Sequence, residues 1–302
     1  AATVTVVGCG ALGSVAADQL VRAGAGRVRI IDRDYIELSN LQRQTLFDES
    51  DIAANLPKAE AAARRLRRVN GSVTVEGVVS DLRAANVEKL CGDATVIVDG
   101  TDNIETRYLI NDFAVKTGRP WVYAGCVGAD GRVLAIVPGQ TACLRCIWDE
   151  PPPPGALESC DTAGVLAAAA ASVASLAVVE TLKVLLGRVD ELSGLLAIDL
   201  WRGQLRRCAT PRDAEHCPCC AERRFGFFQG RRVQTPPAAA GIDLDAIEQR
   251  LSALGSVERN PFMLRAAIGE YRITVFPDGR AIVQGTADPA TARSVLARYV
   301  GM

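Results

Sequence analysis

Short apolar runs alternate with helical segments along most of the chain. Residues 3–7 are apolar and mostly β-branched, residues 14–23 carry apolar positions at helical spacing, and residues 27–31 form a second apolar run. Runs of this length with glycines between them are typical of strands, and their alternation with helices is typical of a parallel sheet. The opening of the chain is therefore predicted to be strand, turn, helix and strand of an α/β domain.

The same alternation continues to about residue 200. Helices are expected at residues 58–69 and 107–117, and strands at residues 73–79, 94–98, 121–124, 133–137 and 195–199. Residues 162–179 include no charged residue, and a run of this length raises the question of a membrane span. Because this run is rich in alanine and leads into Glu180 and Lys183, we expect a buried helix of a soluble domain instead.

Proline-rich stretches suggest the domain boundaries. Four consecutive prolines, at positions 151–154, resist regular structure, so residues 149–160 are predicted to be a mobile crossing loop near the active site. Residues 231–241 have the composition of a linker between a first domain, residues 1–230, and a small α/β module, residues 242–302. Within that module we expect helices at residues 244–254 and 289–300 and strands at residues 271–276 and 281–284.

The composition limits the function classes. A formal net charge of -1 and the absence of a basic run give no indication of nucleic-acid binding, and no membrane association is expected. Ten cysteines, several in close pairs, favour metal or thiol chemistry in a reducing compartment over a disulfide scaffold. No signal peptide is recognised, so a cytoplasmic location is expected.

A glycine turn after the first predicted strand is the first candidate binding site. Gly8, Gly10 and Gly13 have the spacing that permits a tight turn, close approach of phosphate and packing of helix on strand. Asp32 follows the second strand, where an acid can accept hydrogen bonds from a ribose. This Rossmann-like pattern fits NAD, FAD, S-adenosylmethionine or ATP, and it also occurs as a glycine-rich turn without a ligand.

Three further motifs carry a resemblance. Residues 34–44 read DYIELSNLQRQ, residues 57–60 read PKAE and residues 99–103 read DGTDN. In order and spacing they resemble the ThiF/MoeB/HesA family, relatives of the ubiquitin-activating enzymes, and the resemblance runs from residue 3 to about residue 228. It implies an adenylyltransferase that uses ATP to activate the C-terminal glycine of a ubiquitin-like sulfur carrier. Where the family often has glycine, this chain has Ala11, which a negative φ would tolerate.

The resemblance also implies roles for individual residues. Asp32 would bind the ATP ribose, and the phosphates would be lined by Ser39, Asn40, Arg43 and Lys58. Asp102 and Asn103 would face Mg²⁺ and the reacting phosphate; with Cys160, the expected catalytic residues are Arg43, Lys58 and Asp102. Cations suit this reaction because negative charge accumulates on the phosphates. Arg43 and Lys58 could instead be solvated surface charges, and Asp102 could cap the next helix.

Two CxxC pairs predict a metal site. Four thiolates suit a tetrahedral structural zinc, and the family places zinc at the corresponding positions; the predicted ligands are Cys143, Cys146, Cys217 and Cys220. Cys219 lies inside the second pair and could replace Cys220. The pairs could also be incidental cysteines or a disulfide. His216, the only histidine, is interpreted as a bystander.

The remaining cysteines divide into one candidate nucleophile and a structural group. Cys160 precedes the long apolar helix, where a thiol has a lowered pKa, and the corresponding cysteine of several family members bonds to the activated carrier. A small buried residue at a helix start is the alternative. The others are interpreted as core residues: Cys9, Cys91, Cys126 and Cys208.

The resemblance further implies partners: a carrier ending in Gly-Gly, a sulfur-donor protein and a second copy of the chain. The carrier could serve thiamine, molybdopterin, tRNA thiolation or cysteine formation. Family members usually carry an N-terminal arginine that reaches the partner's ATP site. This sequence begins at Ala1, and if the protein has no such segment, weaker adenylation is expected. A non-catalytic carrier-binding scaffold and an NAD-dependent oxidoreductase remain the competing functions.

Overall fold

The computed structural model describes residues 2–152, 163–230, 243–277, 279, 281–286 and 288–301. The chain divides into two compact units, Ala1–Gln234 and Thr235–Met302. Each unit has a hydrophobic core of its own, so each is described by itself.

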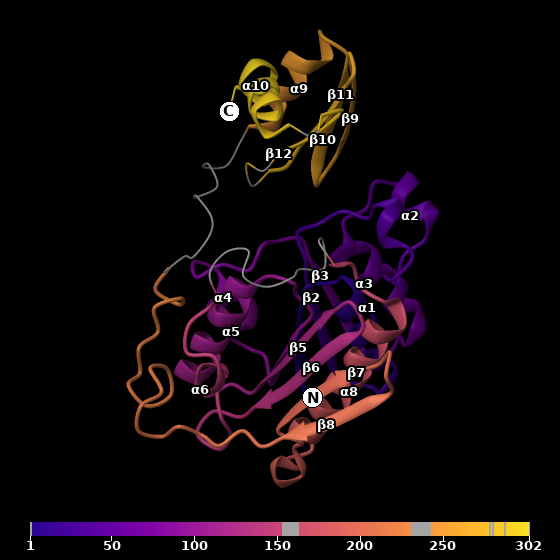
Figure 1. Ribbon diagram of the computed structural model, residues 1–302. Coiled ribbons are helices and arrows are strands. Elements are labelled where there is room, and N and C mark those ends of the chain that lie inside the picture. Colours follow the sequence, from indigo (N-terminus) through magenta and orange to yellow (C-terminus); the bar gives the residue numbers. More distant parts are fainter. Residues whose placement is uncertain are drawn as a thin grey trace. The chain divides into compact units, whose positions relative to one another are not determined.

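The first unit is built on an eight-stranded sheet (Figure 1). The strand order is β3-β2-β1-β4-β5-β6-β7-β8, in which β3 to β5 pair in parallel and β5 to β8 pair antiparallel. The strands are β1 (Thr3–Val7), β2 (Arg27–Ile31), β3 (Thr74–Val78), β4 (Val96–Asp99), β5 (Trp121–Val127), β6 (Asp130–Ile136), β7 (Leu195–Asp199) and β8 (Gln204–Cys208). The predicted α/β sheet flanked by helices is therefore confirmed.

Helices cover both faces of this sheet. One core contains side chains of α1 (Ala11–Arg22), α3 (Lys58–Val69) and α8 (Ala167–Leu185). The opposite core contains side chains of α4 (Val87–Cys91), α5 (Ile104–Thr117) and α6 (Leu144–Ile147), and these two groups of helices lie on opposite sides of the sheet in Figure 1. The short elements are α2 (Glu49–Ala53) and the 3-10 turns η1 (Leu38–Asn40) and η2 (Val189–Glu191).

Helix α8 contains residues 167–179 of the run that raised the membrane question. In the part of the chain that the structure describes, it is the one helix long and apolar enough to cross a membrane. It packs on α1, β5 and β6. The buried residues on this face include Ala170, Val173, Ala174 and Ala177. Small side chains on this face let the helix approach the sheet closely, as expected for a core helix.

The structure also shows where the sequence interpretation was wrong. Cys208 was interpreted as a core residue, but it is exposed. It ends β8, the edge strand of the sheet, in which all five residues are exposed. An edge strand has a neighbour on one side alone, and neither face of β8 is covered by a helix of the described core groups.

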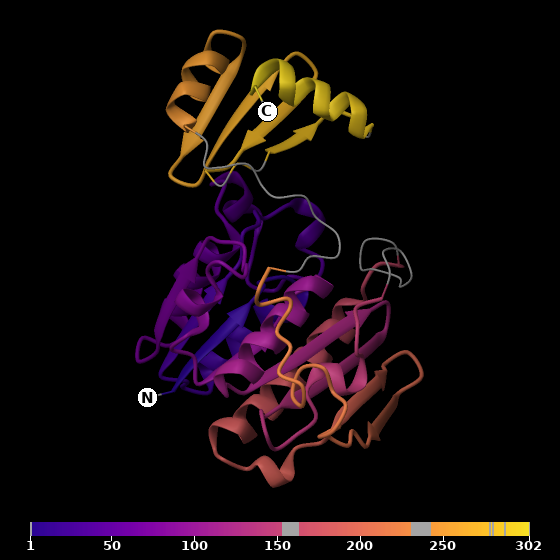
Figure 2. The same cartoon turned by 90° about the vertical axis from the view of Figure 1, so that its left-hand side faces the viewer.

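The second unit is a four-stranded antiparallel sheet with two helices (Figure 2). Its elements are α9 (Leu244–Ser252), β9 (Ser256–Asn260), β10 (Met263–Ile268), β11 (Tyr271–Val275), β12 (Ala281–Gln284) and α10 (Pro289–Tyr299). Leu251 of α9 and Val295 of α10 join Leu264, Ile273 and Val275 of the sheet in one core. Strands β9 and β10 were not predicted; the predicted linker lies outside the described residues.

Candidate nucleotide site and cysteine group

The glycine turn joins β1 to α1 and packs against the loop that follows β4. Gly8 has a φ of +86°, a conformation that L side chains rarely adopt. A Cβ on Gly13 would lie 1.9 Å from the Gly8 carbonyl oxygen, and a Cβ on Gly8 would lie 2.7 Å from the carbonyl oxygen of Gly100. These close approaches require glycine, and Gly10 is left as the N-cap of α1 without a side chain over the helix N-terminus.

Ala11 satisfies the condition set for it. It is the first residue of α1, and among the described non-glycine residues a positive φ occurs at Asn55 and Arg223 alone. The methyl group of Ala11 therefore carries no backbone strain, and the departure from glycine leaves the turn intact.

Asp32 lies directly after β2, where its carboxylate closes the turn. Its Oδ2 accepts a hydrogen bond from the Cys9 backbone N–H at 2.6 Å, and its Oδ1 accepts one from the Asp34 N–H at 2.7 Å. Burial raises the pKa of Asp32, while the nearby charge of Lys58 acts in the opposite direction. Each carboxylate oxygen keeps a further lone pair for a ligand hydroxyl.

Lys58 is not a solvated surface charge. It begins α3, its side chain is 9% exposed, and its Nζ lies 3.6 Å from Asp34 Oδ2. Its backbone N–H donates to the Asp34 carbonyl at 2.9 Å, next to a bridge between Tyr35 and Pro57. These contacts hold the start of α3 beside the segment after β2, where the charge of Lys58 lowers the pKa of the buried Asp32 carboxyl against the effect of burial.

The segment between β2 and α2 places Ser39 and Asn40 on the turn η1 and Arg43 three residues after it. Asn40 is buried, and its Oδ1 accepts the Glu37 N–H at 3.4 Å. Arg43 Nη1 donates to the Ser39 carbonyl at 2.9 Å, so the partly exposed guanidinium lies over the turn. The structure brings these residues together locally and leaves donors of Arg43 free for an anionic ligand.

The loop after β4 carries Asp102 and Asn103. Asn103 is the N-cap of α5, because its Oδ1 accepts the N–H groups of Glu105 at 2.9 Å and of Thr106 at 3.3 Å. The alternative that Asp102 caps this helix is therefore wrong. Asp102 is exposed, one residue before the cap, where its carboxylate can meet a ligand.

Sequence reasoning gave no role to two charged residues beneath this loop. Asp99 ends β4 and is 1% exposed, and Arg107 Nε donates to its Oδ2 at 3.0 Å. The available signal was an aspartate at the end of an otherwise apolar strand, because such a carboxylate needs a cationic partner when it is buried.

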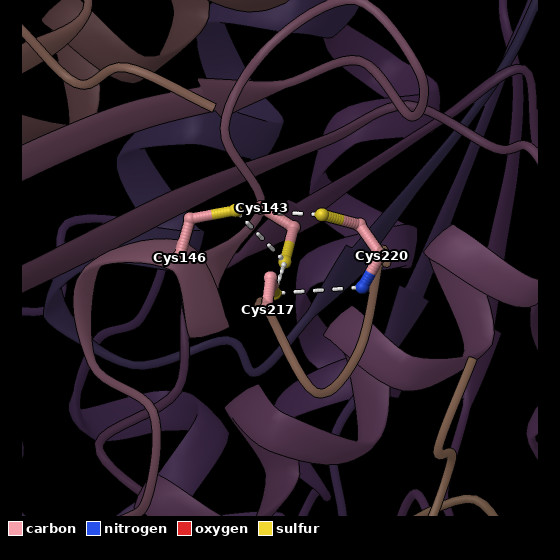
Figure 3. Close-up of side chains that lie close together, drawn as sticks. All are labelled: Cys143, Cys146, Cys217 and Cys220. Carbon is pink, nitrogen blue, oxygen red and sulfur yellow. Dashed lines mark hydrogen bonds between the residues drawn. The ribbon is translucent and has the colours of Figure 1, made fainter. Parts of the chain in front are cut away.

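The four predicted metal ligands converge (Figure 3). Their sulfur atoms all lie within 4.8 Å of one another: Cys143, Cys146, Cys217 and Cys220. Cys143 Sγ lies 3.5 Å from Cys217 Sγ, and Cys146 Sγ lies 3.8 Å from Cys143 Sγ and 3.5 Å from Cys220 Sγ. Four sulfurs around a tetrahedral zinc are separated by about 3.8 Å, so the group fits such an ion.

The structure distinguishes Cys220 from Cys219. Cys219 is not part of the four-sulfur group; its Sγ accepts from Asn111 Nδ2 at 3.3 Å and lies 3.5 Å from Asp112 Oδ1. The pKa of Cys220 is raised to about 12, mainly by burial and further by hydrogen bonds to Cys146 and Cys217. A bound cation would reverse this by favouring the thiolate.

Neighbouring residues hold the cysteine group in place. Asn111 Oδ1 accepts the Leu144 N–H at 2.9 Å beside Cys143, and Asp112 Oδ2 accepts the Phe227 N–H at 2.9 Å after the second pair. His216 is exposed and lies 3.5 Å from Asp213, outside the four-sulfur group. Both CxxC pairs are therefore fastened to α5.

The structure tests the interpretation of the core cysteines but not that of Cys160. Cys160 and the proline run from position 153 onward lie outside the described residues. Cys9, Cys91 and Cys126 are buried, as predicted for core residues.

The parallel strands end in one edge, with the glycine turn after β1, Asp32 after β2 and Asp102 after β4. Ligands of open α/β sheets bind at this carboxyl edge. The fold and the site thus define an α/β protein of the Rossmann-like class. The ThiF family model matches residues 1–219, and the chain belongs to that family.

Three curated proteins show the range of its relatives. The chain is 40% identical to the sulfur carrier protein ThiS adenylyltransferase of Bacillus subtilis, over 99% of this chain and 93% of that protein. It is 40% identical to the sulfur carrier protein adenylyltransferase of Thermus thermophilus, over 73% of this chain and 83% of that protein. It is 35% identical to the SAMP-activating enzyme E1 of Haloferax volcanii, over 72% of this chain and 80% of that protein.

Solved structures support the fold. The crystal structure of E. coli MccB with ATP has a TM-score of 0.64 and 22% identity, over 73% of this chain and 67% of that chain. At this identity the likeness concerns the fold alone.

Proposed function

We propose that this chain is an ATP-dependent adenylyltransferase that activates the C-terminal glycine of a ubiquitin-like sulfur carrier for thiocarboxylate formation. The observation that carries the proposal is the 40% identity to a ThiS adenylyltransferase over 99% of this chain, on a fold whose glycine turn, buried acid and buried lysine meet at one edge. An oxidoreductase would need neither Lys58 nor Asp102 at this edge.

Each residue at the edge has a property that suits its proposed role. Asp32 would accept the ribose hydroxyls with the lone pairs that its backbone contacts leave free. Gly8, Gly10, Ala11 and Gly13 leave the α1 N-terminus open to phosphate. Lys58 would neutralise phosphate charge from a buried position, and Arg43, with Ser39 and Asn40, would contact phosphate oxygens from the η1 side.

Asp102 and Asn103 would serve the reacting centre. Mg²⁺ prefers carboxylate and phosphate oxygens, and Asp102 is an exposed carboxylate at the edge where the phosphates would lie. The ion would supply charge for the developing pyrophosphate. Asn103 uses its Oδ1 for the cap and keeps its Nδ2 as a donor.

The cysteine group would hold a structural zinc. Four protein sulfurs leave no open coordination position, so the ion would join residues 143–146 to residues 217–220 and take no part in the reaction. Cys160 would act as the nucleophile toward the activated carrier. A sulfur-donor protein, a homodimeric assembly and a cytoplasmic location complete the proposal.

ATP–pyrophosphate exchange tests this function directly. Labelled pyrophosphate enters ATP when a carrier carboxylate forms an acyl-adenylate reversibly. We expect exchange that depends on a carrier ending in Gly-Gly and stops when its terminal glycine is removed. Binding of ATP without exchange for any Gly-Gly carrier of the host would contradict the enzyme and favour a carrier-binding scaffold.

A further inference from the structure

We propose that Arg107 positions Asp102 for the adenylation reaction by fixing the peptide plane between Thr101 and Asp102. This inference rests on the proposed function and adds a residue to it. Arg107 lies one turn into α5, with its side chain 12% exposed beneath the loop that follows β4. No role was implied for it by the sequence motifs.

The guanidinium of Arg107 connects three parts of the structure. Its Nε donates to Asp99 Oδ2 at 3.0 Å, and its Nη2 donates to the Thr101 carbonyl at 2.6 Å and to the Ala124 carbonyl of β5 at 3.2 Å. The planar fork also lies over the Tyr123 ring, with the Arg107 Cζ 5.1 Å from its centroid. Arginine is suited to this because its donors have a fixed geometry.

Asp99 holds the same loop from the other side. Its Oδ1 accepts both the Thr101 N–H at 2.8 Å and the Thr101 hydroxyl at 2.7 Å. Its side chain is fully buried, so the ion pair with Arg107 has little solvent screening. Thr101 is therefore fixed at its N–H, its hydroxyl and its carbonyl.

The consequence for Asp102 follows from peptide planarity. The Thr101 carbonyl lies in one plane with the Asp102 N and Cα, so a hydrogen bond to that carbonyl sets the direction in which the Asp102 chain leaves the loop. On the other side, Asn103 is fixed as the cap of α5. Asp102 thus lies between two fixed residues, and its own carboxylate is exposed.

The nearby glycine contacts tie this loop to the candidate phosphate site. A Cβ on Gly100 would lie 2.7 Å from Gly13 Cα and 2.8 Å from the Gly8 carbonyl oxygen. The loop is therefore in contact with the glycine turn two residues before Asp102. A shift of the loop by an ångström would move the carboxylate relative to the phosphates and reduce the rate while leaving nucleotide affinity in place.

The test replaces Arg107 by lysine and compares it with a matched control. Arg107→Lys keeps the charge opposite Asp99, but one ammonium group cannot hold all three acceptors. We expect the exchange rate at saturating ATP and carrier to fall about 100-fold, with the KM for ATP nearly unchanged. Amide hydrogen exchange at Gly100 and Thr101 should become faster.

A second variant tests the other side of the same loop. Thr101→Val, which removes the hydroxyl bond to Asp99 without a change of charge, should lower the exchange rate about tenfold.

Arg29→Lys is the control, because Arg29 is also a buried arginine that bonds two carboxylates, Asp93 and Glu76, and a carbonyl, that of Leu90. It should lower the melting temperature without slowing exchange at saturation. An unchanged rate or unchanged amide protection in Arg107→Lys would overturn the inference, as would an equal rate loss in Arg29→Lys. If the unchanged chain supports no exchange, the adenylation proposal fails, and the amide comparison alone decides whether Arg107 holds the loop.

Discussion

The cysteine group and the nucleotide edge belong to one unit but differ in how complete they are without a ligand. The sulfur atoms of the cysteine group are in mutual contact, and their neighbours Asn111 and Asp112 are fully buried. At the nucleotide edge, Asp32 follows β2, Lys58 begins α3, and Asp102 lies exposed in the loop after β4. The first arrangement fastens chain segments together, whereas the second leaves charges available to a substrate.

The largest expected effect is the loss of the cysteine group. Cys146→Ala removes a half-buried ligand of the proposed zinc, so we expect zinc binding to be lost and the melting temperature to fall by about 10 °C or more. Metal analysis and thermal unfolding, with and without a chelator, measure both effects. Cys219→Ala, a buried cysteine outside the four-sulfur group, is the control and should keep the metal. Retention of the metal by Cys146→Ala would exclude this ligand set.

At the nucleotide edge, the expected effect is on the rate and not on stability. Asp102→Asn should lower the rate of ATP–pyrophosphate exchange about 100-fold, because the Mg²⁺ ligand proposed at the reacting centre is lost. Its melting temperature should change by no more than about 2 °C, since the side chain is exposed. Asp190→Asn, at another exposed position, is the control. A rate for Asp102→Asn like that of the control would remove Asp102 from the reaction.

A smaller effect is expected where a buried charge acts through its neighbour. Lys58 lowers the pKa of Asp32, against the stronger effect of burial. Lys58→Met should therefore weaken ATP binding about 10- to 100-fold and raise the pKa of Asp32. Because protonated Asp32 has a weaker acceptor for the ribose, affinity should then be lost at a higher pH as the solution is acidified.

Calorimetric titration with ATP from about pH 8 to about pH 5 would measure this shift. Lys58→Arg keeps the positive charge, so its ATP affinity should fall at the same acidic pH as that of the wild-type chain. If the ATP affinity of Lys58→Met falls at the same pH as that of the wild-type chain, then Lys58 does not affect the pKa of Asp32.

The sequence predicted those elements whose pattern is local. The helix Lys58–Val69 and the strands Thr3–Val7 and Arg27–Ile31 have the predicted bounds, since one face or both faces of each are apolar. Strand β8, QLRRC, was missed because all its residues are exposed, so its conformation depends on pairing with β7. Strand β9, SVERN, is mostly exposed and similarly depends on its pairing with β10.

The candidate site could be predicted where spacing alone decides the chemistry. Glycines, Asp32 and the CxxC pairs fall into this class. Spacing alone could not exclude Cys219 as a ligand in place of Cys220, or Asp102 as the cap of the next helix, because the fold decides in which direction each of these side chains points. Arg107 was missed because its acceptors lie on β4, β5 and a loop, which come together only in the fold.

The smallest effect is expected from removal of the second unit. Its core shares no residue with the two cores of the first unit, and the Thermus and Haloferax relatives match 73% and 72% of this chain. A chain that ends at residue 230 should therefore support ATP–pyrophosphate exchange within about threefold of the full chain at saturating carrier. The informative quantity is the KM for the carrier: a large rise at an unchanged maximal rate would assign carrier recognition to the second unit. A fall in the maximal rate itself would contradict the separation of the two units and make the second unit part of the reaction.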